Sequence, residues 1–234
     1  MTPFVAELTG TALLILLGNG VVANVVLPQT KGQGGGWIVI TFGWAMAVFV
    51  GVYATGSFSG AHLNPAVTLA LALKSGDYSL LPVYIPAQLL GAMLGAKLVW
   101  FFYRNHFIPG TDTGTMQAVF FTAPAIANPF QNFVAECLGT FVLIIGILLM
   151  TKGDVKLGPL DALPVSLLVL AIGLSLGGTT GYAINPARDL GPRIIYSLLP
   201  IPGKTQQHWS YAWIPVLAPL TGAALAVGLL HWLL

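Results

Sequence analysis

Long apolar stretches alternate with short polar connections along the whole chain. A helix needs about 20 apolar residues to cross a bilayer, and six stretches approach or exceed this length. They are Phe4–Leu27, Trp37–Thr55, Leu80–Tyr103, Phe133–Thr151, Leu160–Leu176 and Tyr211–Leu234. Tryptophan and tyrosine gather near their ends, as they do in the interfacial belts of membrane proteins. The pattern predicts an all-α membrane protein with six transmembrane helices.

Two further apolar stretches, Ala66–Leu73 and Ala187–Leu199, are too short to cross a bilayer. Each begins within an Asn-Pro-Ala tripeptide, at Asn64 and Asn185, where Asn suits a helix N-cap and Pro suits the first helical position. About 8–13 helical residues span roughly 12–20 Å, which is about half of the hydrocarbon core. We expect two re-entrant half-helices; the alternative is a pair of helices lying at the membrane interface.

The two halves of the chain resemble each other in sequence. The segments that begin at Ala6 and Ala87 recur in the same order at Ala135 and Ala218, with an Asn-Pro-Ala element between them in each half. Each half holds three spans, so the second half must enter the membrane in the opposite sense. We therefore expect one channel domain over 1–234, made of repeat 1 (about 1–105) and repeat 2 (about 130–234). Inverted repeats place their transport site at the repeat interface.

The composition excludes several classes of protein. Only 7% of the 234 residues are charged, nine basic and seven acidic, which is far below the usage of soluble domains. A nucleic-acid binder needs clustered basic residues, and a disulfide scaffold needs paired cysteines, whereas Cys137 stands alone. The first residues lack a basic signal region, so we expect the first apolar stretch to remain in the protein.

The half-helix starts have a specific chemistry. Each helix N-terminus carries roughly half a positive charge, so a facing pair opposes cations and leaves neutral solutes unaffected. The side-chain oxygens of Asn64 and Asn185 would cap the helices, which leaves their NH2 groups free to donate to a passing hydroxyl or water. Arg188 lies in the first turn of the second half-helix, where both the dipole and the lipid disfavour a cation. We interpret it as a pore-lining donor; the alternatives are an ion pair with Asp189 or contact with the interface.

Two acidic residues occupy equivalent positions in the repeats. Glu7 and Glu136 lie near the starts of spans 1 and 4, where we expect them to accept hydrogen bonds from the amides of the re-entrant loops. An exposed interfacial position is the alternative for Glu7. Asp189 is expected to steady the start of its helix. His62 either lines the pore or satisfies a loop carbonyl.

At these residues the chain resembles the aquaporin and glycerol-facilitator family, also called major intrinsic proteins. The similarity rests on Ser59–Thr68 (SGAHLNPAVT) and Gly181–Arg188 (GYAINPAR). It implies a homotetramer with one pore per subunit in the plasma membrane, with both termini cytoplasmic and the inter-repeat loop extracellular. It also implies no enzymatic activity, no cofactor, no metal, and no partner besides the lipid bilayer and small neutral solutes; nucleic acid is excluded.

The resemblance further implies which residues select the solute. The selectivity filter would consist of Trp44, Gly173, Tyr182 and Arg188, where glycine at 173 in place of histidine is similar to glycerol facilitators. Asp189 and Pro215 also resemble that subclass. Tyr182 replaces the more common Phe, and we expect its hydroxyl to narrow the filter. Backbone carbonyls along the path would belong to Gly60, Ala61, His62, Gly181, Tyr182 and Ala183.

The resulting hypothesis is a passive channel for glycerol and water that excludes ions and protons. A water-selective channel, or one for urea or lactic acid, stays open as an alternative. A secondary transporter is a further class, with Glu7 and Glu136 as its candidate ion-binding acids. An intramembrane hydrolase using Ser59 and His62 is the third class, and it lacks a third residue to orient the pair.

Overall fold

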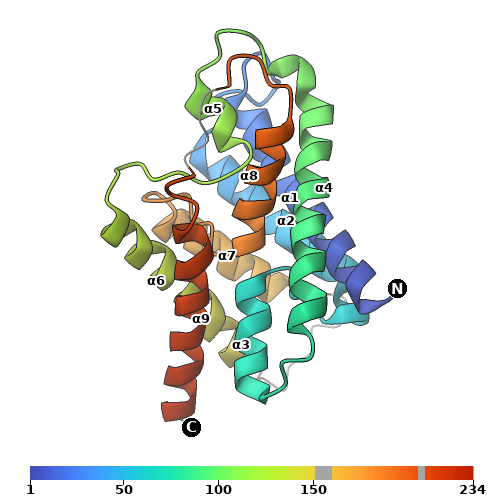
Figure 1. The fold of residues 1–234 in the computed structure, drawn as a ribbon, viewed down its shortest axis with the longest axis vertical. Helices are drawn as coiled ribbons and strands as arrows, with labels where there is room; N and C mark the ends of the chain where they lie inside the picture. The colour runs from blue at the N-terminus through green and yellow to red at the C-terminus, as the bar shows by residue number, and fades with distance from the viewer. Residues whose placement is uncertain (151–159, 205–208, 234) are drawn as a thin grey trace.

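The computed structural model describes residues 1–150, 160–204 and 209–233, and this part of the chain is helical with no strand. Figure 1 shows the helices arranged along one long axis. Five helices are long and apolar enough to cross a membrane. They are α1 (Pro3–Val26), α2 (Gly36–Ser59), α4 (Leu81–Tyr103), α6 (Pro129–Met150) and α9 (Ile214–Leu233). These five confirm five of the six predicted spans.

The sixth predicted span, Leu160–Leu176, corresponds to α7 (Leu163–Leu176), which has 14 residues. At 1.5 Å per residue α7 covers about 21 Å, less than the usual hydrocarbon thickness of about 30 Å. The predicted end of the preceding span, Thr151, lies outside the described residues. The fold nevertheless matches the predicted class, because α7 packs between α2 and α6 as a member of the same bundle.

The two short apolar stretches are half-helices, α3 (Pro65–Ser75) and α8 (Pro186–Leu198). In Figure 1 they follow one another along the long axis, α8 above α3, with their N-terminal ends facing each other near mid-height. Both lie inside the bundle, since each of them packs on α4 and on α9. The alternative of two interfacial helices is therefore wrong.

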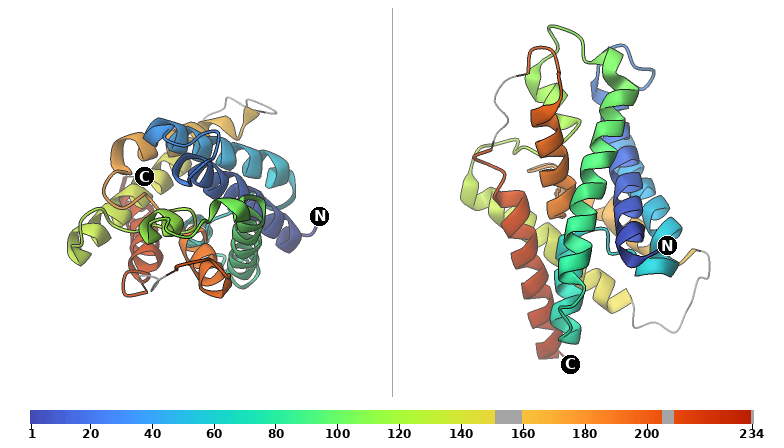
Figure 2. Two further views of the ribbon diagram at one scale, coloured as in Figure 1. Left: turned by 90° about the horizontal axis from the view of Figure 1, so that it is seen from above. Right: turned by 45° about the vertical axis from the view of Figure 1, so that its right-hand side comes forward.

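Helix packing repeats between the halves. In the first half α1 packs on α2 and α4, and in the second half α6 packs on α7 and α9; Figure 2 shows α1 and α4 side by side in both views. The closest approaches are equivalent as well. A Cβ on Gly91 of α4 would collide with the Leu8 carbonyl of α1, and one on Gly222 of α9 would collide with the Cys137 carbonyl of α6. Glycine is required at both crossings because the backbones nearly touch.

The polar stretch 104–131 contains more structure than its composition predicts. It holds a short 3-10 helix at Arg104–His106 and the six-residue helix α5 (Thr113–Ala118). Its apolar residues Phe120 and Phe121 are buried against Tyr196 of α8. Helix α6 also begins at Pro129, before the predicted start at Phe133. The reason is a local Asn-Pro signal: Asn128 accepts from the Gln131 amide at 3.1 Å, ahead of Pro129 in the first turn.

Candidate functional site: a cavity between two re-entrant loops

The two re-entrant loops have the same backbone conformation. Gly60, Ala61 and Leu63 have φ of 78°, 47° and 51°, and the equivalent Gly181, Tyr182 and Ile184 have φ of 84°, 38° and 43°. Non-glycine residues seldom adopt positive φ, so two such pairs at equivalent positions indicate a conformation that the surroundings enforce. This conformation lets the chain reverse within a few residues and begin a helix at the centre of the bundle.

Each half-helix is capped by its asparagine. Asn64 Oδ1 accepts from the Ala66 amide at 2.9 Å, and Asn185 Oδ1 accepts from the Ala187 and Arg188 amides at 3.0 and 3.2 Å. Both side chains are buried and line the central cavity. Amide groups that have no intrahelical partner are thereby satisfied without water.

The expectation that both asparagine NH2 groups are free is only half right. Asn64 Nδ2 donates to the Ile184 carbonyl at 2.8 Å, and Asn185 Nδ2 donates to the Leu63 carbonyl at 2.9 Å. These reciprocal bonds tie the two loops together. Each NH2 group has two hydrogens, so one hydrogen of each side chain remains for a solute in the cavity.

Glu7 and Glu136 hold the loops in place. Glu7 is fully buried and accepts from the His62 and Leu63 amides at 2.9 and 2.7 Å, from Ser59 Oγ at 2.7 Å and from Gln88 Nε2 at 2.8 Å. The alternative of an exposed interfacial Glu7 is therefore wrong.

Glu136 is also fully buried, and it accepts from the Ala183 and Ile184 amides, both at 2.9 Å. Without Glu7 and Glu136, each of these backbone donors would be unpaired away from water.

The contacts of Glu7 also bear on the alternative of a secondary transporter. Because fixed protein donors occupy its acceptor sites, Glu7 is poorly suited to bind a coupling ion.

A cavity of about 270 Å³ lies between the loops. Its apolar lining includes Trp44, Val48 and Val52 of α2, Leu143 of α6 and Val169 of α7. The two loops and the half-helix starts also contribute to the lining. Of the six residues expected to present carbonyls, five border the cavity: Gly60, Ala61, His62, Tyr182 and Ala183. Gly181 is absent from this lining.

Three of the four predicted filter residues border the cavity. The Arg188 guanidinium lies over the Trp44 ring, 4.2 Å from its centroid, and Tyr182 lines the same cavity. Arg188 is buried, and its Nη1 has no hydrogen-bond partner among the described residues. Gly173 does not border the cavity. The Tyr182 ring covers it: a Cβ at 173 would lie 2.8 Å from Tyr182 Cζ and 3.0 Å from its hydroxyl oxygen.

Asp189 forms an ion pair, but with Arg193 and not with Arg188. Its Oδ1 lies 2.8 Å from Arg193 Nε, and its Oδ2 accepts from the Thr122 amide and hydroxyl at 2.8 and 2.6 Å. Arg193 also donates to the Thr122 carbonyl at 2.9 Å and lies over the Phe121 ring. Asp189 therefore anchors the inter-repeat segment to α8, and this role extends beyond steadying the helix start.

His62 borders the cavity, which is the first of its two predicted roles, and its ring contacts a threonine hydroxyl and not a loop carbonyl. Its Nδ1 lies 3.2 Å from Thr68 Oγ1, and its ring borders the central cavity. It also borders a second cavity of about 350 Å³ at the far end of α3, which includes Lys74 and Asp77. There the Ser79 amide donates to the Asp77 carboxyl and holds its pKa below the ordinary value. The second cavity shares the lining residues His62 and Leu71 with the central one.

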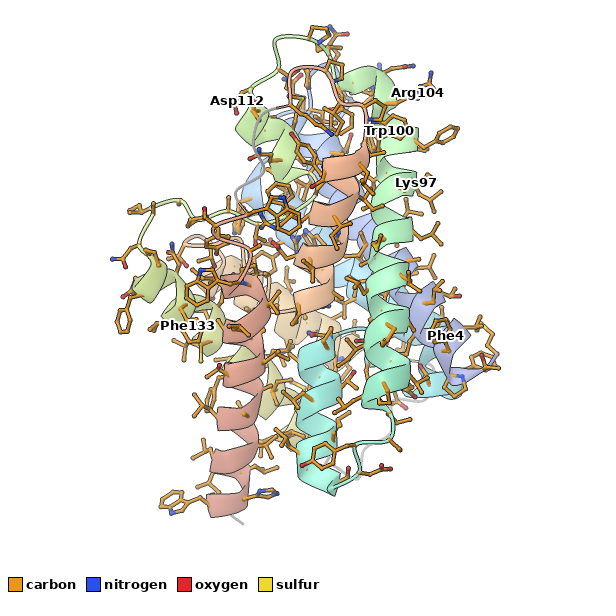
Figure 3. All side chains as sticks on the ribbon, viewed as in Figure 1. Phe4, Lys97, Trp100, Arg104, Asp112 and Phe133 are labelled. Atoms are coloured by element: carbon orange, nitrogen blue, oxygen red, sulfur yellow. The ribbon has the colours of Figure 1, made fainter. Side chains whose placement is uncertain are left out.

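Several charged or reactive residues do not join the site. Lys97 is exposed on α4, where Figure 3 labels it together with Trp100 of the same helix. Ser59 Oγ donates to Glu7, and His62 contacts Thr68, so these two residues form no nucleophile–base pair. The part of the chain that the structure describes also contains no cluster of residues able to hold a metal ion.

Three residues of the site escape sequence reasoning. Gln88 Nε2 donates to Glu7 and Thr68, Thr122 binds Asp189, and Trp37 Nε1 donates to the Gly173 carbonyl at 3.0 Å. Gln88 had a usable signal, because a glutamine within an apolar span needs a polar partner. Trp37 and Thr122 had no usable signal. In sequence, Trp37 cannot be distinguished from an ordinary interfacial tryptophan, and Thr122 cannot be distinguished from an ordinary loop threonine.

The fold and cavity define a polytopic membrane channel, and comparison with known proteins identifies its family. The sequence profile of the major intrinsic protein family matches residues 1–231, so the chain belongs to this family. It is 55% identical over 229 residues to the glycerol uptake facilitator protein of Streptococcus pneumoniae, covering 97% of both chains. It is 50% identical over 234 residues to the probable glycerol uptake facilitator protein of Thermotoga maritima, covering 100% of both.

A solved structure has the same fold. The aquaglyceroporin from Plasmodium falciparum superimposes with a TM-score of 0.85 at 33% identity, covering 96% of this chain and 93% of that chain. Together with the helical bundle, these matches make the chain a multi-pass membrane channel and not an enzyme.

Proposed function

We propose that the chain is a passive channel for glycerol and water that excludes ions and protons. The mixed lining of the central cavity carries this proposal. Glycerol has a carbon edge and a hydroxyl edge, and the cavity is lined both by apolar side chains of α2, α6 and α7 and by the two loops with their capping asparagines. The glycerol facilitators and the aquaglyceroporin described above are similar to this chain over nearly its whole length.

The selectivity filter is proposed at Trp44, Tyr182 and Arg188, with Gly173 behind the Tyr182 ring. The Trp44 ring offers an apolar surface to the carbon edge of glycerol. The unpartnered Nη1 of Arg188 offers a donor to a hydroxyl oxygen, and a solute that accepts this bond satisfies a buried polar group. The carbonyls of the two loops then accept hydroxyl hydrogens along the path.

Exclusion of cations is proposed to arise from three positive features. The N-termini of α3 and α8 face each other at the cavity, each with about half a positive charge, and Arg188 adds a full charge at the filter. The remaining N–H groups of Asn64 and Asn185 donate to a water oxygen at the centre. A hydrated proton or metal ion meets positive potential at each of these points, whereas glycerol and water do not.

The assembly and its setting follow as further parts of the proposal. We place the chain in the plasma membrane as a homotetramer with one channel per subunit, with both termini in the cytoplasm. Repeat 1 (about 1–105) and repeat 2 (about 130–234) form one channel domain joined by an extracellular loop. Labelling of single cysteines at the exposed positions Asp77 and Asp112 from either side of a vesicle tests the orientation. Figure 3 labels Asp112 near one end of the bundle, and Asp77 follows the C-terminal end of α3, which lies near the opposite end in Figure 1.

Light scattering from proteoliposomes tests the solute. Vesicles are first shrunk in glycerol, urea or lactic acid, and the rate of re-swelling measures entry of each solute, while a pH-sensitive dye inside reports proton leak. We expect rapid re-swelling in glycerol with no added proton leak. Faster recovery in urea or lactic acid than in glycerol would identify one of these as the preferred solute, and shrinkage without recovery in any solute would indicate a water channel.

A further inference from the structure

One filter residue, Tyr182, is held by a side chain that lies outside the cavity. Trp37 near the start of α2 does not border the central cavity, and 40% of its surface is exposed. Its ring nevertheless meets the Tyr182 ring edge-on, with 5.8 Å between centroids and 78° between planes. Edge-to-face pairs of this kind are attractive beyond the area that they bury.

Trp37 also binds the backbone of the segment that packs behind the Tyr182 ring. Its Nε1 donates to the Gly173 carbonyl at 3.0 Å, which links α2 to α7. Gly173 and Gly177 of this region have no side chain, and the Tyr182 ring fills the space: a Cβ on Gly177 would lie 2.5 Å from Tyr182 Cδ1 and 2.8 Å from Trp37 Cζ2. The ring thus lies between two glycines and one tryptophan.

The remaining side of the Tyr182 ring faces the cavity. Its backbone is fixed, because φ is positive and the next amide, Ala183 N, donates to Glu136. The Arg188 guanidinium and the Trp44 ring are in contact with each other and line the same cavity. The width of the filter therefore depends on the position of the Tyr182 ring, and Trp37 prevents this ring from moving away from the cavity.

We propose that Trp37 is a specificity-determining positioning residue: it sets the width of the filter by holding the Tyr182 ring toward Arg188. This inference rests on the proposed glycerol channel function. It predicts that selectivity by solute size depends on a residue that contacts no solute. Removing the Trp37 ring lets Tyr182 move outward and widens the filter.

The test compares Trp37→Ala with wild type in proteoliposomes. We measure the entry rates of glycerol and of a five-carbon polyol in the same vesicles, because their ratio does not depend on how much channel is folded. Widening should raise the ratio of five-carbon polyol to glycerol by about threefold or more, which is the range expected from losing one edge-to-face aromatic contact. Trp232→Ala is the matched control, since Trp232 is 81% exposed at the end of α9.

A second variant separates the two contacts and covers poor folding. Trp37→Phe keeps a ring near Tyr182 and removes the donor to the Gly173 carbonyl, so it should shift the ratio in the same direction by a smaller factor. If Trp37→Ala is not recovered in vesicles, Trp37→Phe decides the question. A wild-type ratio in whichever of these variants is recovered would overturn the role of Trp37. Absence of glycerol entry in wild type would instead overturn the proposed function.

Discussion

Substitution of Glu7 by glutamine tests how the re-entrant loop is held. Glu7 Oε1 accepts from Ser59 Oγ and the His62 amide, and Oε2 accepts from the Leu63 amide and Gln88 Nε2. A glutamine has one oxygen and one NH2 group. In one orientation the NH2 group faces the His62 amide, and in the other it faces the Leu63 amide. Either way a backbone donor loses its acceptor inside the membrane.

The expected cost follows from this geometry. An unsatisfied buried donor lowers the free energy of unfolding by about 1–3 kcal/mol. Hydrogen bonds to a charged acceptor are stronger than those to a neutral one, so we expect a loss of about 3 kcal/mol for Glu7→Gln. For a chain of this size that loss corresponds to a decrease in Tm of about 6–12 °C. The Gly60 and Ala61 carbonyls belong to the same loop and border the cavity, so glycerol permeability per channel should also fall.

Thermal unfolding of the detergent-solubilised protein provides the assay. Asp77→Asn is the matched control, because it makes the same acid-to-amide change at an exposed loop position and should unfold close to wild type. Glu136→Gln should behave like Glu7→Gln, since its two oxygens each accept from one loop amide. If Glu7→Gln unfolded at the temperature of Asp77→Asn, the proposed anchoring of the loop by Glu7 would be refuted.

Four further substitutions probe the filter and its support. Tyr182→Phe should raise the glycerol-to-water ratio, because the hydroxyl is expected to narrow the filter, and should raise stability by up to about 1 kcal/mol, because the removed hydroxyl is buried without a partner; an unchanged ratio would show that the hydroxyl does not narrow the filter. Gly173→His should reduce glycerol entry more than water entry, since the new side chain must displace the Tyr182 ring; equal losses would count against this placement. Arg188→Val should increase cation leak into vesicles by about tenfold, or about 1.4 kcal/mol, through loss of a positive charge; unchanged leak would assign exclusion to the half-helices alone. Asp189→Asn should lower the free energy of unfolding by about 3–5 kcal/mol, because the buried Arg193 guanidinium loses the Asp189 carboxylate; a wild-type Tm would contradict this.

The sequence predicts the helices well because the bilayer imposes strong patterns. A span needs a long apolar run, and an Asn-Pro start followed by a short run indicates a half-helix, so five spans and both half-helices could be located. The start of α6 at Pro129 was missed although the same Asn-Pro signal precedes it. Helix α5 has six residues and no apolar period long enough to detect.

The site is predictable only where a residue's chemistry conflicts with its surroundings. Glu7, Glu136 and Arg188 are charges in apolar sequence, and each lies at the re-entrant loops. Contacts between residues of ordinary type are not predictable in this way. The bond from Asn64 to the Ile184 carbonyl and the edge contact of Trp37 with Tyr182 join segments more than a hundred residues apart, and they depend on how the two repeats dock.

The ion pair of Asp189 shows a signal that sequence reasoning overlooked. Asp189 and Arg193 are four residues apart on one helix, which is a standard spacing for an ion pair. Arg188 is adjacent to Asp189 in sequence, but neighbouring residues on a helix point in different directions. Consequently the supporting pair and the filter arginine could have been distinguished from spacing alone.

The most direct test of the central claim is the dependence of glycerol entry on concentration and on ion gradients in proteoliposomes. A passive channel through the cavity predicts entry that rises in proportion to glycerol concentration and stays the same when sodium and proton gradients are imposed or removed. Entry that saturates at low glycerol concentration and requires either gradient would contradict the account and indicate a coupled transporter.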